Sequence, residues 1–180
     1  MTDLTKDISI VMISMNEEKA IKAVLTGIQN NTPNAEVIII DSSSDKTPEI
    51  AAKFPNVKLI RQYPPIGYGP AMSLALRSAT KNYIVTMDCD NTYPPEDILP
   101  MVSLMNQKSY DLVDGSRLRT KPKNMPWINY LGNIFFGLIA SILFFRIFLD
   151  LHSGMRVYRK NTLSEFQWRE KEPALPVELL

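Results

Sequence analysis

The chain has 180 residues, a formal net charge of +1, and 45% hydrophobic and 22% charged residues, which is an ordinary globular composition. This length suffices for one domain with a substantial core, and the near-neutral charge gives no electrostatic reason to expect a nucleic-acid partner. The chain contains one cysteine, Cys89, and one histidine, His152, so an intramolecular disulfide, a cysteine-cluster zinc site and a multi-histidine metal site are excluded. The lone cysteine fits a reducing compartment, and the N-terminus has no basic segment followed by an apolar one, so we expect no signal peptide.

The first half of the chain alternates short apolar runs with helical patterns. We expect strands at residues 8–13, 36–40, 57–60 and 83–87, and helices at residues 17–29, 47–54 and 68–79. In the first of these helices, Ile21, Val24 and Ile28 recur at helical spacing. Continuous β-branched strands separated by helices indicate the α/β class, with a mainly parallel sheet flanked by helices on both faces.

The second half begins with a fifth expected strand at residues 111–117, followed by a basic, proline-containing linker at residues 121–126. Residues 127–149 then carry a single charge, Arg146, and are nearly long enough to span a bilayer. Polar and small residues interrupt this stretch, so we expect a helix that lies at a membrane interface or, alternatively, in the core with a solvated basic edge. The flanking basic residues suit anionic headgroups or lipid phosphate. They are Lys121, Lys123, Arg146, Arg156, Arg159 and Lys160.

Polar residues follow three of the expected strands, at 14–17, 41–45 and 88–90. Ligands of parallel sheets bind beyond the carboxyl ends of the strands, so three polar loops at one edge favour a binding site there. Helix capping is the alternative interpretation, and Asp45 before Thr47 is a good candidate for it.

Capping does not explain the segment Asp88-Cys89-Asp90, which follows the expected strand at 83–87. Residues i and i+2 of an extended segment point the same way, and two neighbouring carboxylates repel each other unless a cation lies between them. Asp88 and Asp90 therefore suit one hard divalent cation, with open positions for phosphate oxygens. A strand end with two solvated acids is the alternative. Cys89 is expected on the opposite face, as a small core residue.

Six segments, taken in order, resemble the family 2 glycosyltransferases of the GT-A fold, and in particular the polyprenyl-phosphate sugar transferases such as dolichyl-phosphate mannose or glucose synthases. The segments are 11–18, 38–44, 67–69, 88–90 (the Asp-x-Asp of the family), 115–117 and 150–159 (similar to the family's Asp-x-x-Ser-Gly-Phe-Arg). The resemblance extends over residues 8–180, and it implies one GT-A catalytic domain. Residues 1–118 would form its nucleotide-sugar-binding half and residues 119–180 its acceptor-facing and membrane-facing part.

The chain also departs from the family pattern. Ile13 stands where the family has proline, and the loop at 41–47 lacks the usual paired acid and glycine. The arginines that often follow the basic linker are absent near residues 131–133. Glu178 resembles the acid of a late family helix, beyond which the family's domain usually continues, so we expect a C-terminally incomplete domain.

The resemblance implies an enzyme of the hexosyltransferase class that moves a sugar, with inversion, from a UDP- or GDP-linked donor to a polyprenyl or dolichyl phosphate. Mg²⁺ or Mn²⁺ would be held by Asp88 and Asp90, and Asp90 and Arg117 would be catalytic, the arginine stabilising charge on the donor phosphates. The substrate-binding residues would be Ser14, Glu17 and Asp41 on the nucleoside side, Asp88, and Ser153, Gly154 and Arg156 near donor or acceptor phosphate. Such an enzyme would be peripheral on the cytoplasmic face of a membrane.

Several alternatives stay open at this level. Arg117 and Arg156 would otherwise form surface salt bridges with Asp111 or Asp150. His152 is interpreted as a structural hydrogen-bonding residue, with a metal ligand as the alternative. A phosphate acceptor is largely ionised at neutral pH and needs little help from a general base, whereas a soluble or glycan hydroxyl acceptor would need a carboxylate base. A non-catalytic nucleotide-sugar-binding protein is the third possibility.

Overall fold

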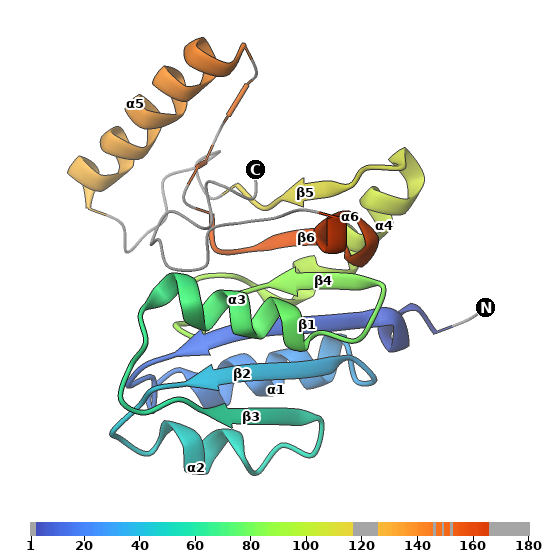
Figure 1. Cartoon of the computed structure of the whole chain (residues 1–180), viewed down its shortest axis with the longest axis vertical. Coiled ribbons are helices and arrows are strands. Elements are labelled where there is room, and N and C mark those ends of the chain that lie inside the picture. The colour runs from blue at the N-terminus through green and yellow to red at the C-terminus, as the bar shows by residue number, and fades with distance from the viewer. Residues whose placement is uncertain (1–2, 117–125, 146, 149, 152, 166–180) are drawn as a thin grey trace.

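The computed structural model describes residues 3–116, 126–145, 147–148, 150–151 and 153–165. In this part of the chain, six strands form one mixed sheet with the order β3-β2-β1-β4-β6-β5 (Figure 1). The first four strands are parallel to one another, whereas β6 runs antiparallel to both β4 and β5. The strands are β1 (Ile8–Ser14), β2 (Glu36–Asp41), β3 (Val57–Arg61), β4 (Tyr83–Thr86), β5 (Leu112–Asp114) and β6 (Arg156–Arg159).

Helices cover both faces of this sheet. The helices of the described part of the chain are α1 (Ile21–Asn31), α2 (Thr47–Ala51), α3 (Tyr68–Ser78), α4 (Ile98–Lys108), α5 (Trp127–Phe144) and α6 (Lys160–Glu165), with short 3₁₀ turns η1 (Leu4–Asp7) and η2 (Pro95–Asp97). One apolar cluster joins the sheet to α1, α2 and α4, and a second joins its other face to α3 and α6. Figure 1 shows α3 in front of the sheet and α1 behind it.

The alternation of side chains along the strands explains why both faces are buried. Ile10 and Met12 of β1 belong to the cluster under α1, whereas Val11 between them belongs to the cluster under α3. Each apolar side chain of this size contributes roughly 1.5–3 kcal/mol when it is fully buried. The expected α/β class and the mainly parallel sheet are therefore confirmed.

Three parts of the architecture were not predicted. The helix α4 was missed, and so were the antiparallel strand β6 and the short helix α6. The expected helix at 17–29 starts only at Ile21, because the carbonyl of Glu17 accepts from the N–H groups of Ala20 and Ile21 in a preceding turn. The expected helix at 127–149 is shorter as well: it ends at Phe144, and Phe145 adopts a left-handed conformation with φ of 54°.

The helix α5 is unlike the other helices. Figure 1 shows it set apart from the sheet, and most of its apolar side chains are exposed. These exposed residues are Trp127, Ile128, Leu131, Ile134, Phe135, Phe136, Leu138, Ile139, Ile142 and Leu143. Among the residues that the structure describes, no helix is both long and apolar enough to cross a membrane.

Candidate active site

The carboxyl ends of the parallel strands meet at one edge of the sheet, which we call the carboxyl edge. The strand register places Ser14 beside Asp41, and Asp41 beside Arg61. The loops that follow β1, β2 and β4 leave this edge, as expected for the ligand-binding edge of an α/β sheet.

Asp41 is fully buried and is held by several partners at this edge. Its carboxylate accepts hydrogen bonds from Ser14 Oγ at 2.5 Å, Ser43 Oγ at 2.7 Å and Ser43 N–H at 3.2 Å. Arg61 forms an ion pair with the same carboxylate and donates to the Ser43 carbonyl at 2.8 Å. Since the Arg61 side chain is 43% exposed, it is the group through which this network meets solvent. Arg61 was missed because the strand was expected to end at residue 60.

The loop after β1 is joined to the loop after β2 by hydrogen bonds. Asn16 N–H donates to Ser43 Oγ at 2.8 Å, and Glu17 N–H donates to Thr47 Oγ1 at 2.8 Å. Asp45 accepts from Thr47 N–H at 2.9 Å, but it is not the cap that was expected: Lys46 is the N-cap residue of α2, and Asp45 lies one residue before it. The two loops therefore form one surface on the nucleoside side of the expected site.

The segment 88–90 follows β4 with the alternation expected from the sequence. Cys89 is buried in the core, while Asp88 is half-buried and Asp90 is exposed. Asp90 Oδ1 accepts from Thr92 N–H at 2.9 Å, which closes a turn in which Asn91 has a positive φ of 63°. Burial raises the pKa of the Cys89 thiol, and Asp88, Glu17 and Asp90 raise it further, so Cys89 is an uncharged core residue and not a nucleophile.

Glu17 connects the first loop electrostatically with this segment. Burial raises the pKa of the half-buried Glu17 carboxyl, and the negative charges of Asp90 and Asp45 raise it further. A half-buried carboxyl whose pKa is raised by the charges of neighbouring carboxylates lies in a negative potential that favours a bound cation.

The side chains at this edge fit a divalent cation that is shared with a substrate. In the described part of the chain, no three His, Cys, Asp or Glu side chains are grouped closely enough to hold a metal ion by themselves. Asp88 and Asp90 would supply two carboxylates, and the other positions of an octahedral Mg²⁺ or Mn²⁺ would be left to phosphate oxygens and water. This is the usual arrangement for a metal that binds together with a phosphorylated substrate.

Gly154 lies directly against Asp88, although 66 positions separate them in the sequence. A Cβ atom at residue 154 would lie 2.1 Å from Asp88 Oδ2 and 2.6 Å from Asp88 Cγ, so only glycine fits here without displacing the carboxylate. Gly154 N–H donates to the Tyr93 hydroxyl at 2.6 Å, and Ser153 Oγ donates to the Gly115 carbonyl at 2.7 Å. The structure therefore brings the segment 153–154 to Asp88.

Arg156 is buried at the start of β6, where its side chain is 1% exposed. Nε donates to Asp114 Oδ1 at 2.8 Å, and a terminal nitrogen donates to the Leu151 carbonyl at 2.8 Å. Burial lowers the pKa of the guanidinium, but Tyr158 and Asp114 outweigh this effect and the pKa is raised. Arg156 thus forms an ion pair with Asp114 inside the protein.

Tyr68, at the first turn of α3, lies in the segment 67–69 that resembles the family, but it was not among the expected site residues. Burial and the nearby charge of Asp88 raise the pKa of its phenol to about 12, so it stays protonated at neutral pH. Gly67 precedes it with φ of 92°, a conformation that glycine adopts without strain.

Three other residues that the sequence singled out lie outside the described residues. They are Arg117, His152 and Glu178.

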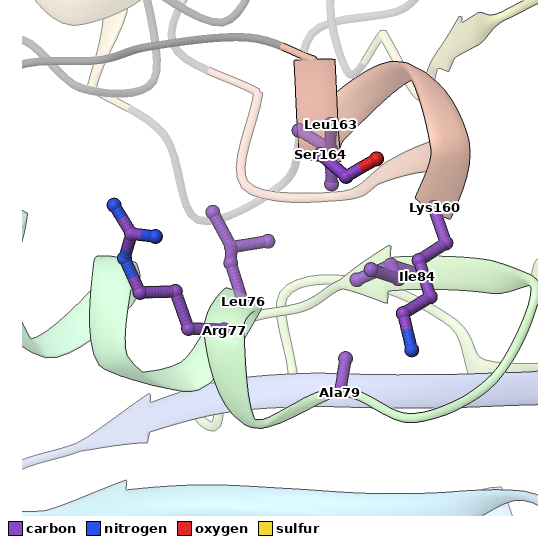
Figure 2. A pocket seen from close by; sticks show the side chains of 7 residues that line it. All are labelled: Leu76, Arg77, Ala79, Ile84, Lys160, Leu163 and Ser164. Carbon is purple, nitrogen blue, oxygen red and sulfur yellow. The ribbon is translucent and has the colours of Figure 1, made fainter.

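A cavity of about 300 Å³ lies elsewhere, at the opposite edge of the sheet, where β4 begins (Figure 2). Leu76, Ala79, Ile84 and Leu163 make it largely apolar. Figure 2 shows the Lys160 side chain pointing away from Leu163, and its ammonium donates to the Thr80 carbonyl at 3.0 Å. The chemistry-bearing groups are therefore gathered at the carboxyl edge and not in this cavity.

The mixed sheet with helices on both faces is the GT-A fold. Residues 9–166 match the model of glycosyl transferase family 2, and the chain belongs to that family. A dolichyl-phosphate hexose transferase of Haloferax volcanii is 41% identical over 182 residues, covering 100% of this chain and 78% of the relative. A UDP-N-acetylglucosamine–dolichyl-phosphate N-acetylglucosaminyltransferase of Methanococcus voltae is 28% identical over 88% of this chain and 71% of the relative.

Solved structures agree on the fold. Mannosyl-3-phosphoglycerate synthase from Rubrobacter xylanophilus superposes with a TM-score of 0.68 at 18% identity, over 86% of this chain and 53% of that one. The mannosyltransferase PcManGT from Pyrobaculum calidifontis, in complex with GDP-Man and Mn²⁺, gives a TM-score of 0.65 at 20% identity, over 93% of this chain and 49% of that one. The chain therefore spans about half the length of these two solved proteins.

Proposed function

We propose that this chain transfers a hexose from a UDP- or GDP-linked donor to a polyprenyl or dolichyl phosphate, with inversion at the anomeric carbon. The observation that carries the proposal is the contact between Asp88 and Gly154, because it joins the expected metal-binding segment to the expected phosphate-binding segment at the carboxyl edge. The names of the relatives from Haloferax and Methanococcus support dolichyl phosphate as the class of acceptor.

On the donor side, Asp88 and Asp90 would hold Mg²⁺ or Mn²⁺ together with the diphosphate of the nucleotide sugar. A divalent cation at this position supplies Lewis-acid stabilisation of the charge that develops on the leaving nucleoside diphosphate. The half-buried Asp88 is fixed against Gly154, whereas the exposed Asp90 is free to present its second oxygen to the donor side. The raised pKa of Glu17 supports a cation at this edge, because positive charge there would relieve its repulsion with Asp90.

On the nucleoside side, Ser14, Glu17 and Asp41 would shape the cleft for the base and ribose. Asp41 is fully buried, so its part is to hold the half-exposed Arg61 in place as the group that meets the nucleoside. The guanidinium of Arg61 offers hydrogen-bond donors, which suit the carbonyl oxygens of uracil or guanine.

In the transfer step, an oxygen of the acceptor phosphate attacks the anomeric carbon from the side opposite the diphosphate. The new carbon–oxygen bond forms as the bond to the diphosphate breaks, so the nucleoside diphosphate leaves and the configuration inverts. The acceptor phosphate is largely ionised at neutral pH, because its second pKa is about 6, and the step therefore needs no general base. Arg117 would stabilise the charge on the donor phosphates, and Ser153, Gly154 and Arg156 would fix the segment that faces the phosphates.

The acceptor side would lie at the cytoplasmic face of a membrane, with α5 in the interface. Its apolar side chains are exposed along the whole helix, and water-exposed apolar surface of this extent is typical of membrane or protein contacts. Trp127 and Tyr130 lie edge to face at its N-terminal end, with ring centroids 5.8 Å apart, and such aromatic residues are favoured at the level of lipid headgroups. A peripheral enzyme anchored in this way would meet its lipid acceptor without crossing the bilayer.

The proposal is tested by incubating the protein and Mn²⁺ with radiolabelled UDP-glucose or GDP-mannose and vesicles that contain polyprenyl phosphate. We expect label in the organic phase with one of the donors, and none after addition of EDTA. Label transferred to a water-soluble hydroxyl acceptor in the absence of vesicles would instead identify a different acceptor class. Donor binding without any transfer would support a non-catalytic nucleotide-sugar-binding protein.

A further inference from the structure

Tyr93 lies three residues after Asp90, and its ring is anchored in the core. It is 4% exposed and belongs to the apolar cluster that also contains α1 and α4 side chains. The loop that carries it is fixed on both sides. Asp90 accepts from Thr92 N–H at 2.9 Å, and Pro95 packs so closely on α1 that a Cβ at Gly27 would lie 2.8 Å from its Cγ. The hydroxyl of Tyr93 therefore has a well-defined position.

This hydroxyl holds the turn that contains Gly154. Gly154 N–H donates to it at 2.6 Å, while the neighbouring Ser153 is tied to the Gly115 carbonyl at 2.7 Å. Ser153 Oγ also accepts from Met155 N–H at 3.3 Å. The turn is thus fixed from one side by the loop after Asp90 and from the other by the end of β5.

Gly154 in turn limits where the Asp88 carboxylate can lie. Its hypothetical Cβ would lie 2.1 Å from Asp88 Oδ2, so the glycine backbone forms one wall of the space that the carboxylate occupies. Gly67 is the one glycine with a positive φ in the described part of the chain, so close contact, and not backbone conformation, makes glycine necessary at residue 154.

We propose that Tyr93 is a positioning residue: by holding Gly154 in place, it holds the Asp88 carboxylate in the orientation that binds the divalent cation. This inference rests on the proposed function, in which Asp88 and Asp90 share that cation. It adds a residue that makes no direct contact with the cation but determines how well the cation binds.

The first test measures binding of Mn²⁺ alone and of Mn²⁺ with UDP or GDP, from the loss of the electron paramagnetic resonance signal of the free ion. Tyr93→Phe keeps the ring and removes the acceptor of the Gly154 N–H. We expect the Kd for Mn²⁺ to rise roughly three- to tenfold, which is the usual effect of losing one buried hydrogen bond. The matched control is Tyr83→Phe, which removes a tyrosine hydrogen bond of 2.7 Å to Asn106 at the other end of β4 and should leave the Kd unchanged.

The second test approaches the same carboxylate from its other side. Gly154→Ala adds a methyl group at Asp88, and we expect it to raise the Kd for Mn²⁺ more than Tyr93→Phe does. Gly132→Ala is the matched control, because a Cβ at Gly132 meets nothing within 4 Å. Since both substitutions act through one carboxylate, the double variant Tyr93→Phe/Gly154→Ala should bind Mn²⁺ no more weakly than Gly154→Ala alone.

The outcomes separate this inference from the function on which it rests. If the unchanged chain binds Mn²⁺ and Tyr93→Phe binds it with the same Kd, the positioning role of Tyr93 is wrong while the metal site stands. If the unchanged chain binds no Mn²⁺ with either nucleotide, the metal site and the positioning role are both wrong. Fully additive effects of the two substitutions would show that Tyr93 does not act through Gly154.

Discussion

Each edge of the parallel sheet holds a half-buried glutamate, Glu36 at the amino edge and Glu17 at the carboxyl edge, and the pKa values of the two are shifted in opposite directions. At the amino edge, Glu36 accepts from Ser9 Oγ at 2.5 Å and from Thr80 N–H at 3.0 Å, and these bonds lower its pKa although burial acts against them. At the carboxyl edge, burial and the charges of Asp90 and Asp45 raise the pKa of Glu17. The amino edge therefore uses its carboxylate for stability, whereas the carboxyl edge keeps electrostatic repulsion that a bound cation would relieve.

This difference agrees with the proposal that the carboxyl edge binds a charged ligand and the amino edge does not. A sheet edge that only holds the domain together satisfies its charged groups, while an edge that binds a charged ligand leaves some of them incompletely compensated. The comparison predicts that substitutions at the two edges separate activity from stability. Four substitutions test it.

The largest effect is expected for Asp90→Asn at the carboxyl edge. The amide keeps the shape of the side chain but is a much poorer ligand for Mg²⁺ or Mn²⁺, so transfer to the lipid should fall roughly 100-fold or more. The urea midpoint should stay unchanged, because Asp90 is exposed. The matched control is Glu36→Gln at the amino edge, which should keep the transfer rate and lower the urea midpoint. If Asp90→Asn and Glu36→Gln both lost transfer activity, or if neither did, the proposed difference between the two edges would be wrong.

The next largest effect, a loss of stability, is expected for Arg156→Met. Arg156 lies near the carboxyl edge but, unlike Glu17, it is paired with an opposite charge, so this variant is expected to lose stability as a variant of the amino edge would. The substitution leaves Asp114 without its buried partner, and Asp114 is 26% exposed, so water compensates in part. We expect a loss of about 2–3 kcal/mol in the free energy of unfolding, measured by urea denaturation.

The control for this variant is Lys58→Met, which removes an exposed cation from β3 and should change the free energy of unfolding by less than about 0.5 kcal/mol. Equal stabilities of the two variants would mean that the Arg156 pair contributes nothing net to folding. In that case the buried charge of Arg156 would have to be explained by ligand binding alone.

The third effect is the pH dependence of stability that Glu36 contributes. Its pKa in the folded protein lies below its usual value of 4.5, so its stabilisation is present above pH 4.5 and is lost as the pH falls through the folded-state pKa. Glu36→Gln should therefore be less stable than the unchanged protein by about 1 kcal/mol at pH 7, with the difference shrinking at acid pH. Urea midpoints measured from pH 3 to pH 7 test this, and a difference that is constant over that range would contradict it.

Particular residues show how much of the fold and of the candidate site could be predicted from the sequence. The four parallel strands follow from continuous β-branched runs, and the burial of Cys89 between two more exposed acids follows from the alternation of side chains after a strand. The helix α4 could also have been predicted, because its buried residues Ile98, Val102 and Met105 recur at helical spacing. By contrast, β6 has four residues, and its antiparallel position depends on partners far away in the chain.

The contacts that shape the site could not be predicted from the sequence either, because they too depend on partners far away in the chain. The packing of Gly154 on Asp88 and the bond from Gly154 to Tyr93 join segments more than 60 positions apart, and no local pattern encodes them. Asp41 was expected to meet the base or ribose directly. Its burial by Ser14, Ser43 and Arg61 depends on the register of three strands and becomes visible only once they are paired.

The smallest effect is expected for Glu17→Gln, and it tests the carboxyl edge most directly. Because the folded protein raises the pKa of Glu17, its charged form opposes folding, and the cost grows as the pH rises above 4.5. The variant should therefore be slightly more stable than the unchanged protein at pH 7, by a few tenths of a kcal/mol at this half-exposed position. Mn²⁺ with UDP or GDP should reverse the order, since a bound cation stabilises the protein with the charged Glu17 more strongly. A variant that is less stable than the unchanged protein at pH 7 without Mn²⁺ would show that Glu17 is satisfied as Glu36 is, and the contrast between the two edges would be lost.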